Sequence, residues 1–491
     1  MKEKYESLQL VDLKAVAKAR GLKGTSTMKK EELVELMLKE DEKDLAKGKD
    51  VTPKSVVPAK TKDNSETKAK KSEESASKEA SKDTSKDSGK ETVSKEATPS
   101  SSKNEVYDST NFPKELDSGE EASGILEVMS DGYGFIRCAN YLPGENDVYV
   151  SPAQIRKFGL KTGDILVGNT RVRTQTEKFA ALLYIKTING YTVEEASKRY
   201  NFEDMTPIFP DERIKLERPG CSVAMRIVDL ISPVGKGQRG MIVSQPKAGK
   251  TTLLKEVAKS VKINQPNTHL IILLIDERPE EVTDIKEAIE GPNVEVIYST
   301  FDELPEHHKR VSEMVIERGR RLVEHKQDVM ILIDSITRLT RAYNLTVAPS
   351  GRTLSGGLDP AALHMPKRFF GAARNMREGG SLTILATALV ETGSKMDDVV
   401  YEEFKGTGNM ELVLDRKLSE RRVFPAIDIV KSGTRREDLL LDEEEYEAIN
   451  ILRKALNGLK SEDAVDHILD MFAKTRDNRE FVNVVKKTKW I

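Results

Sequence analysis

Beyond Arg226, runs of consecutive apolar residues alternate with segments in which apolar residues recur at helical spacing. A strand that is apolar at every position is buried on both faces, and helices between such strands cover both faces of a parallel sheet. The apolar runs are MIVSQ, HLIILLID, VEVIYST, VMILID and SLTILATAL. The sequence therefore predicts that residues 226–491 form an α/β domain of the nucleotide-binding type.

The first apolar run leads into QPKAGKTTLLKEVAKS, where a strand ends, a short loop follows and a helix opens. Backbone N–H groups at such a helix N-terminus bind phosphates, a lysine reaches the terminal phosphates and a hydroxyl binds magnesium. Lys250 and Thr251 fit these roles, although the first glycine of the usual G-x-x-x-x-G-K-[ST] pattern is missing. The pattern favours nucleotide binding over a chance Gly-Lys-Thr helix start.

Two other apolar strands end in carboxylates. Asp334 closes VMILID, and Glu277 follows the run HLIILLID. The carboxyl ends of parallel strands meet at one edge of the sheet, so both side chains are expected beside the phosphate loop. There Asp334 would act on the metal and Glu277 would orient or deprotonate the attacking water. A simple strand-end cap is the alternative for Asp334.

Short alternating strands, separated by Gly, Pro and Asn turns, precede the α/β domain and are typical of a small closed barrel such as an OB-fold. In DGYGFIR, Tyr133 and Phe135 stand two apart, hence on one strand face. We expect Gly132 and Gly134 to leave that face open and Arg137 to add charge. Paired rings of this kind stack on unpaired bases, whereas a lone aromatic residue in a strand more often belongs to the core.

Composition divides the remainder of the chain. Apolar residues at helical spacing predict a small helical subdomain at 1–45. Residues 46–106 contain no Leu, Ile, Phe, Tyr or Trp, so we expect a disordered charged linker at 46–117. The barrel is then expected at 118–193 and a connector at 194–225.

The charge balance is nearly even, because 79 Lys+Arg face 81 Asp+Glu and the net charge is −2. Any nucleic-acid surface must therefore be a local patch. Cys138 and Cys221 have no C-x-x-C spacing, which argues against a disulfide scaffold or a structural zinc site. No segment approaches the roughly 20 apolar residues of a membrane span, and we expect a cytoplasmic protein with no membrane partner.

From about Ser118 to the C-terminus, an ordered series of segments resembles the bacterial transcription termination factor Rho family. The segments are DGYGFIR, DVYVSPAQIRKFGLKTGD, QPKAGKTT, LLIDERPEEVTD, DSITRLTRAYN, LHMPKRFFGAARN, ETGSKMDDVVYEEFKGTGNMEL and RRVFPAIDIVKSGTRREDLL. Residues 1–45 resemble the N-terminal helical subdomain of that family. The resemblance implies a multidomain protein with that subdomain, an OB-fold or cold-shock-like β-barrel and a RecA-like α/β P-loop ATPase domain.

The resemblance also implies an RNA-dependent ATPase and 5′-to-3′ RNA translocase or helicase. Such a protein forms a homohexamer, uses ATP and Mg²⁺, binds nascent single-stranded pyrimidine-rich RNA and releases it from the RNA polymerase elongation complex. It implies Glu277, Asp334 and Lys250 as catalytic residues, with Arg422 and Arg435 supplied by a neighbouring subunit, and Thr251 and Asp334 on the metal. The nucleotide-contacting residues that it implies are Gly235, Lys236, Gly237, Gln238, Arg239, Gly240, Lys247, Ala248, Gly249, Lys250, Thr251, Thr252, Arg278 and, on the adenine, Phe424.

For RNA, the resemblance implies a primary site on the barrel and two loops facing a central pore. Lys178 stands where arginine is common, Ala180 where an aromatic residue is common and Arg352 where lysine is usual. The expected base preference is for cytosine. The RNA-contacting residues that the resemblance implies are Tyr133, Phe135, Arg137, Asp147, Tyr149, Glu177, Lys178, Phe179, Arg352 and Lys395.

Two rival interpretations remain open at the level of sequence. One is another RecA-like ring ATPase, such as a catalytic subunit of a rotary ATP synthase or a flagellar export motor, although these lack a barrel with paired aromatic residues. The other is an RNA-binding chaperone or attenuator whose ATPase is vestigial, against which Glu277, Asp334 and Arg435 argue together. Stimulation of ATP hydrolysis by pyrimidine-rich RNA separates the predicted translocase from both.

Overall fold

The computed structural model describes residues 29–30, 33–34, 36, 114–174, 176–456 and 461–488. The chain divides into two compact units, Met1–Ser100 and Ser101–Ile491. In the first unit a short helical stretch with buried Leu33 and Val34 is described. Most of the helical subdomain predicted at 1–45 lies outside the described residues, as does the predicted linker up to residue 113.

The first folded part of the second unit is a closed five-stranded barrel with the order β1-β2-β3-β5-β4. Its neighbouring strands are antiparallel except β3 and β5, which are parallel. The core contains Leu126, Ile136, Leu166 and Ile185, so inward-facing apolar residues alternate with outward-facing ones, as the sequence predicts. The barrel elements are β1 (Asp117–Val128), β2 (Gly134–Arg137), β3 (Val148–Val150), α4 (Pro152–Phe158), β4 (Ile165–Arg171) and β5 (Ala180–Ile188).

The second part is the motor domain, a nine-stranded sheet with the path β14-β13-β7-β12-β10-β8-β9, to which β11 and β6 add. The strands from β13 to β9 along this path are parallel. The strands are β6 (Pro207–Ile208), β7 (Arg239–Ser244), β8 (His269–Glu277), β9 (Val294–Thr300), β10 (Asp328–Asp334), β11 (Arg374–Met376), β12 (Ser381–Leu389), β13 (Met410–Leu414) and β14 (Gly433–Thr434).

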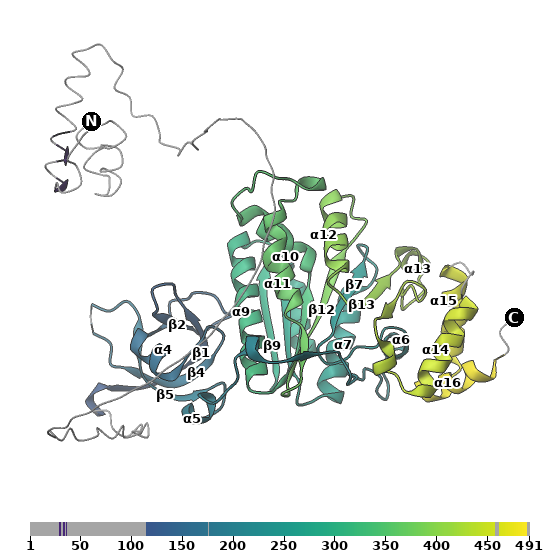
Figure 1. Cartoon of the computed structure of the whole chain (residues 1–491), viewed down its shortest axis with the longest axis horizontal. Coiled ribbons are helices and arrows are strands. Elements are labelled where there is room, and N and C mark those ends of the chain that lie inside the picture. The colour runs from purple at the N-terminus through teal and green to yellow at the C-terminus, as the bar shows by residue number, and fades with distance from the viewer. Residues whose placement is uncertain are drawn as a thin grey trace, which may run out of the picture. The chain divides into compact units, whose positions relative to one another are not determined.

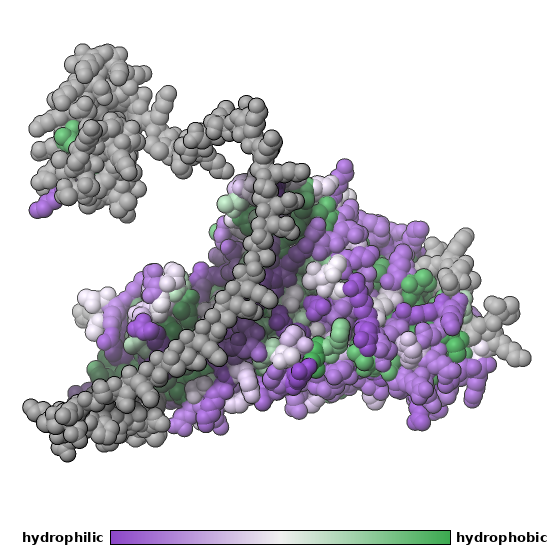
Figure 2. Space-filling view, in the orientation of Figure 1, coloured by the Kyte–Doolittle hydropathy of each residue, from purple (hydrophilic) through white to green (hydrophobic). Residues whose placement is uncertain are grey.

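Successive residues of the central strands enter two different apolar cores. Ile272 and Met330 belong to the core covered by α6, α7, α8, α14, α15 and α16, whereas Ile271 and Ile331 belong to the core covered by α9 to α12. Helices thus cover both faces of the sheet (Figure 1), and hydrophilic residues dominate the face of the described part that Figure 2 shows. The motor helices are α6 (Val223–Ile231), α7 (Lys250–Asn264), α8 (Pro279–Ala288), α9 (Pro305–Glu324), α10 (Ile336–Thr346), α11 (His364–Gly371), α12 (Lys395–Lys405), α13 (Arg416–Glu420), α14 (Glu443–Leu456), α15 (Ser461–Ala473) and α16 (Asn478–Lys487).

The connector predicted at 194–225 holds a short helix, α5 (Val193–Ala196), a 3-10 turn and strand β6 before it enters α6. It does not fold as a separate body, because Phe202 is buried in the motor core. Strand β13 has no counterpart among the apolar runs of the sequence. Its burial alternates along the strand, so it lacks the continuous apolar run that identifies the strands at the centre of the sheet.

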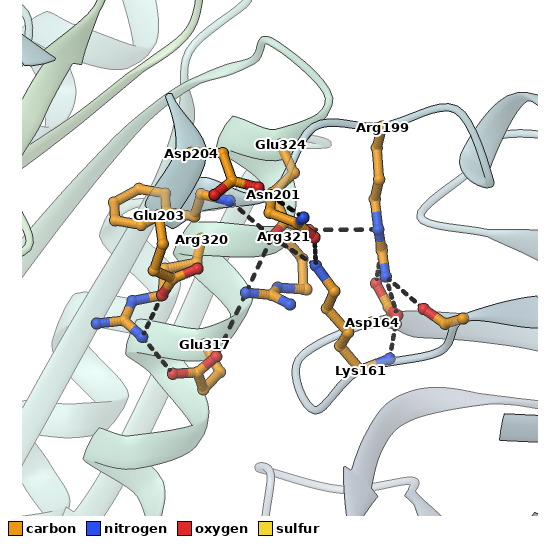
Figure 3. A network of polar contacts seen from close by, with 12 residues as sticks. Lys161, Asp164, Arg199, Asn201, Glu203, Asp204, Glu317, Arg320, Arg321 and Glu324 are labelled. Carbon is orange, nitrogen blue, oxygen red and sulfur yellow. Dashed lines mark hydrogen bonds and ion pairs between the residues drawn. The ribbon is translucent and has the colours of Figure 1, made fainter. Parts of the chain in front are cut away.

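Barrel and motor meet through a network of charged side chains around Glu324, at the end of α9 (Figure 3). The Glu324 carboxylate lies 3.0 Å from Lys161, 3.3 Å from Arg199 and 3.2 Å from Arg321. Asp164, on the barrel side, accepts a second hydrogen bond from Arg199 at 2.8 Å. A buried carboxylate with several cationic partners is costly to separate from them, so these pairs hold the barrel against the motor.

Across the described part of the chain, no helix combines the length and the apolar character needed to cross a membrane.

Candidate nucleotide site and RNA interface

The phosphate loop follows β7 and ends where α7 begins at Lys250. Gly249 precedes the helix with φ of +91°, a left-handed conformation that glycine adopts without strain. Ser419, in α13, donates a hydrogen bond to the backbone oxygen of Lys247 at 3.1 Å. The free backbone N–H groups of the first turn of α7 and the hydroxyl of Thr251 therefore stand at the end of β7, as the motif predicts.

Lys250 lies between two carboxylates that come from different strands. Its Nζ is 3.2 Å from Glu277 Oε1, at the end of β8, and also contacts Asp334 Oδ1, at the end of β10. Asp334 Oδ1 accepts a further hydrogen bond from Thr387 Oγ1 at 2.8 Å. Asp334 is 1% exposed and Glu277 4%. The expected meeting of lysine and carboxylates at one edge of the sheet is thus present.

Burial and charge tune the protonation of this cluster. Burial raises the pKa of Glu277, and the charge of Asp334 raises it further, against the opposing effect of Lys250. Burial alone would lower the pKa of Lys250, but the charges of Asp334 and Glu277 outweigh it, and the pKa of Lys250 is raised. The lysine is therefore cationic, and Glu277 is a stronger base than an exposed glutamate.

The second oxygen of Asp334 gives a test of whether a metal fits. Asp334 Oδ2 is buried and has no hydrogen-bond partner among the described residues. Those residues also contain no group of three or more His, Cys, Asp and Glu side chains placed to hold a metal. Mg²⁺ at phosphate sites is typically bound by one or two protein groups together with phosphate oxygens and water. Asp334 and the nearby Thr251 fit such an ion.

A cavity of 590 Å³ opens beside the phosphate loop. Phe424, whose side chain is 56% exposed, lines it together with Ala248 and Thr252. The segment from Gly220 to Ala224 forms another part of its wall. That wall was missed at the level of sequence, because the segment lies in the connector and carries no phosphate-binding pattern. This cavity is therefore the candidate site for the base of a nucleotide.

The segment Gly235–Gly240 lies elsewhere. It enters β7 at the end opposite the phosphate loop, and the six residues of β7 span roughly 17–20 Å. Its polar groups already have partners at that end, as Gly237 N donates to Thr383 Oγ1 at 2.9 Å and Gln238 Nε2 to Asn409 Oδ1 at 2.7 Å. Lys236 pairs with Glu212 and Asp328. The expectation that Gly235, Lys236, Gly237, Gln238, Arg239 and Gly240 flank the nucleotide of their own chain is therefore corrected.

The arginines predicted at the site fall at two ends of the sheet. Arg278 follows Glu277 directly, and its exposed side chain lies 4.0 Å from Glu281. Arg422 is exposed in the turn after α13, on the side of the phosphate loop. Arg435 is exposed at the opposite end, where its backbone N–H donates to Asn409 O at 2.8 Å. Within one chain, Arg435 does not meet Lys250.

On the barrel, aromatic rings gather on one face. The ring centroid of Phe135 lies 5.8 Å from that of Tyr133, 6.0 Å from that of Tyr149 and 5.2 Å from that of Phe179. All four rings are half-buried, so each keeps part of its surface open to a stacking partner. Gly134 does not open this face. It is buried, and an added Cβ would meet Leu126 Cδ1 at 2.9 Å, so its role is to pack inside the barrel.

A buried arginine stands beside these rings. The Arg137 guanidinium lies 4.9 Å from the ring centroid of Phe135 and donates to Asp147 Oδ2 at 2.5 Å and to Glu127 Oε2 at 2.7 Å. Glu177 pairs with Arg171, and Lys178 Nζ lies 5.2 Å from the ring centroid of Phe179. Glu127 and Arg171 carry no signal in the sequence, because neither belongs to an aromatic or glycine-rich pattern.

The two loops that carry Arg352 and Lys395 pack against each other. An added Cβ on Gly356 would lie 2.4 Å from the backbone nitrogen of Met396 and 2.7 Å from the carbonyl carbon of Lys395. The side chains of Arg352 and Lys395 are exposed. The close approach of the loops at Gly356 thus presents both cations near the same edge of the motor.

Comparison with known proteins gives three family matches. Residues 122–194 match the Rho termination factor RNA-binding domain, residues 224–434 the nucleotide-binding domain of the ATP synthase alpha/beta family and residues 4–43 the Rho termination factor N-terminal domain. The transcription termination factor Rho of Pseudomonas aeruginosa is 55% identical over 381 residues, which cover 76% of this chain and 90% of that protein. The chain belongs to the transcription termination factor Rho family.

Other Rho proteins give similar values. The Rho of Bacillus subtilis is 55% identical over 74% of this chain and 84% of that protein, and the Rho of Thermotoga maritima is 54% identical over 74% and 86%. Membership of the Rho family confirms the predicted fold class, and it makes the chain a transcription termination factor with an RNA-binding barrel and an ATPase domain. ATP and RNA are thus its ligands at the level of the two domains.

Proposed function

We propose that this chain assembles into a homohexamer that hydrolyses ATP, moves 5′-to-3′ along single-stranded pyrimidine-rich RNA and releases nascent RNA from the RNA polymerase elongation complex. The observation that carries the proposal is the meeting of Lys250, Glu277 and Asp334 at one strand edge, in a chain whose barrel presents open aromatic rings. The first feature performs ATP hydrolysis, and the second holds the strand along which the motor moves.

In the proposed ATP site, Lys250 exchanges its carboxylate partners for the terminal phosphates of ATP, while the N–H groups of Lys247 to Thr252 line the same phosphates. Phe424 packs on the adenine, and Arg278 lies at the rim. Release from Lys250 leaves Glu277 free to accept a proton from water aligned with the terminal phosphate. Its raised pKa favours this proton transfer.

Thr251 and the Oδ2 atom of Asp334 would hold Mg²⁺, largely through water. The partnerless buried position of this oxygen supports the assignment. The chemistry that the ion supplies when bound is neutralisation of charge on the phosphate oxygens.

The exposed positions of Arg422 and Arg435 support a role across a subunit interface. An arginine supplied in trans stabilises the charge that develops on the transferred phosphoryl group. Because Arg435 lies at the opposite end of the sheet from Lys250, it acts on the site of a neighbour in the proposed ring. Mixing inactive Arg435→Ala with inactive Glu277→Ala protein should restore part of the activity, since mixed rings contain intact composite sites. No recovery despite verified subunit exchange would contradict the trans role.

RNA contacts divide between the barrel and the motor. Tyr133, Phe135, Tyr149 and Phe179 stack on bases, while Arg137, Asp147, Glu177 and Lys178 contact their edges or the backbone. Arg352 and Lys395 then grip the RNA backbone without reading its sequence.

The decisive experiment measures ATP hydrolysis by the full chain with and without oligo(C), together with displacement of a complementary strand placed 5′ or 3′ of a single-stranded loading region. We expect strong stimulation by oligo(C) and displacement in one direction. A rate of ATP hydrolysis that is the same with and without oligo(C) would favour another RecA-like ring ATPase. RNA binding with no hydrolysis would favour an RNA chaperone with a vestigial ATPase.

A further inference from the structure

The carboxylate of Glu127, in β1 of the barrel, is shared by two arginines from different domains. Arg137 Nε and Arg310 Nη2 each donate to Glu127 Oε2 at 2.7 Å. Arg137 belongs to the barrel, whereas Arg310 lies in the second turn of α9 in the motor. Charge-assisted bonds from two guanidinium groups hold a carboxylate in one orientation.

The orientation of the Glu127 carboxylate matters because Glu127 is one of the two carboxylates that hold the Arg137 guanidinium in place. Its Nη1 donates to Asp147 Oδ2 at 2.5 Å, and its Nε donates to Glu127. Arg137 is 6% exposed and Asp147 2%. Together they present a donor and an acceptor beside the ring of Phe135, which is the combination that distinguishes one base edge from another.

Packing alone does not hold Glu127 in place. A cavity of 500 Å³ opens at this seam between barrel and motor and is lined by Glu127, Thr162, Arg310 and Glu313, among others. Side chains bordering such a space keep rotameric freedom unless polar contacts remove it. Among the described residues, Glu127 supplies the one carboxylate that Arg310 contacts, and Arg310 Nε is buried without a partner.

The segment that leads into the helix of Arg310 contacts the strand end that carries Glu277. Helix α9 follows β9, and Phe301, just after that strand, donates its backbone N–H to Glu277 O at 3.1 Å. Arg310 therefore contacts Arg137 through Glu127, and its helix follows the segment that contacts the strand end carrying Glu277.

We propose that Arg310 is a positioning residue for base recognition, which fixes Arg137 against Asp147 by holding Glu127 and so makes the base preference of the barrel depend on helix α9. This inference rests on the proposed RNA-binding role of the barrel. Loss of Arg310 leaves Glu127 with one cationic partner and free to turn. The Arg137 guanidinium then loses its fixed plane, and discrimination between bases weakens more than affinity does.

The test uses the full chain without nucleotide and compares the affinities for short oligo(C), oligo(U) and oligo(A). We expect Arg310→Ala and Arg310→Gln each to reduce the preference for oligo(C) by about three- to tenfold, within the range of one base contact. Arg310→Lys keeps one donor to Glu127 and should restore most of the preference. Arg476→Ala, which removes a side chain that is 92% exposed on the motor, is the matched control and should change nothing.

Three outcomes would overturn the inference or its basis. An equal loss for all three oligonucleotides, with a shallower salt dependence, would make Arg310 a phosphate contact. If Arg310→Ala and Arg310→Gln keep the preference for oligo(C) but Arg137→Ala loses it, Arg310 has no positioning role. The proposed base pocket would still be supported. An unchanged preference in Arg137→Ala would contradict the proposed base pocket itself.

Discussion

The candidate nucleotide site and the aromatic face of the barrel differ in which side chains they bury and which they leave exposed. At the nucleotide site, charged groups are buried and paired with one another, as Lys250 is with Glu277 and Asp334. On the aromatic face of the barrel, apolar rings such as Phe135 and Phe179 remain partly open to solvent. Burial strengthens electrostatic contacts and shifts pKa values, whereas stacking on bases needs accessible ring surface.

The difference teaches that one chain can make its two activities separately sensitive to mutation. Substitutions at the nucleotide site should act on chemistry and leave RNA affinity intact, while ring substitutions should do the reverse. Substitutions at the contact between barrel and motor, around Glu324 and Arg310, are the ones that can affect both activities.

The largest effect is expected from Lys250→Ala, which removes the cation that we propose binds the terminal phosphates. Nucleotide binding should be lost, and hydrolysis should fall by about 10³-fold or more. Binding of a fluorescent ATP analogue and phosphate release measure the two effects. Lys255→Ala, on the same helix but paired with Asp284 at the surface, is the control. Retention of ATP affinity in Lys250→Ala would contradict the assigned phosphate loop.

Glu277→Gln should preserve nucleotide binding and slow hydrolysis by roughly 10²-fold or more, because only proton acceptance from water is lost. The control is Glu280→Gln, an exposed residue in the first turn of α8. An equal loss of ATP binding in Glu277→Gln would remove Glu277 from the role of base.

The same residue predicts a pH dependence. A base works when ionised, so hydrolysis should rise with pH through the pKa of Glu277. Because burial and Asp334 raise that pKa, the rise should occur above the ordinary value for glutamate, about 4.3, and should vanish in Glu277→Gln. A rise that persists in the variant would belong to another group.

Replacing both Tyr133 and Phe135 by alanine should weaken single-stranded RNA binding by about 1–3 kcal/mol per lost stack. ATP affinity should not change, because the rings lie on the barrel. Tyr446→Ala, at an exposed position on α14, provides the control in fluorescence-anisotropy titrations. If RNA affinity stays the same, both rings serve the barrel core.

The smallest expected effect concerns His325, which stacks on Tyr191 of the barrel with ring centroids 4.5 Å apart. Burial, followed by the charge of Arg199, lowers the pKa of His325 to about 4. Between about pH 6.5 and 4 the imidazole of His325 is protonated in the unfolded chain but neutral in the folded chain. The free energy of unfolding should therefore fall as the pH drops from about 6.5 towards 4. With solvent screening, the change should be on the order of 1 kcal/mol.

Thermal unfolding midpoints at pH 5.0 and 7.5 measure this effect, with His325→Gln expected to reduce the difference. His364→Gln, at an exposed position, should keep the difference of the unaltered chain. An identical pH response in His325→Gln would show that the seam between barrel and motor does not depend on this imidazole.

The sequence predicted what depends on consecutive residues or on regular periodicity. Lys250 and Thr251 were placed by a contiguous motif, and Glu277 by its position after an apolar strand. Prediction failed where the contact is distant in sequence. Glu127 and Arg310 are 183 positions apart, and neither residue has a local pattern that reports the other.

Three further differences between prediction and structure have simple physical causes. Strand β13 alternates in burial and so lacks the apolar run of its neighbours. Gly134 was assigned to the open face although side chains alternate along a strand, which places it inside when Phe135 points outwards. Family resemblance likewise placed Gly235–Gly240 at the nucleotide, whereas the direction of β7 carries them to the far edge of the sheet.

The shared carboxylate of Glu324 has a consequence for how this protein can change over evolutionary time. Lys161 and Arg199 of the barrel side and Arg321 of the motor all depend on it, and removing one member of a buried charge group commonly costs about 3–5 kcal/mol. A lineage can therefore replace these residues only together or through a compensating intermediate. Substitutions at exposed positions of either domain usually cost less than about 0.5 kcal/mol, whereas substitutions among these four residues must be matched to one another.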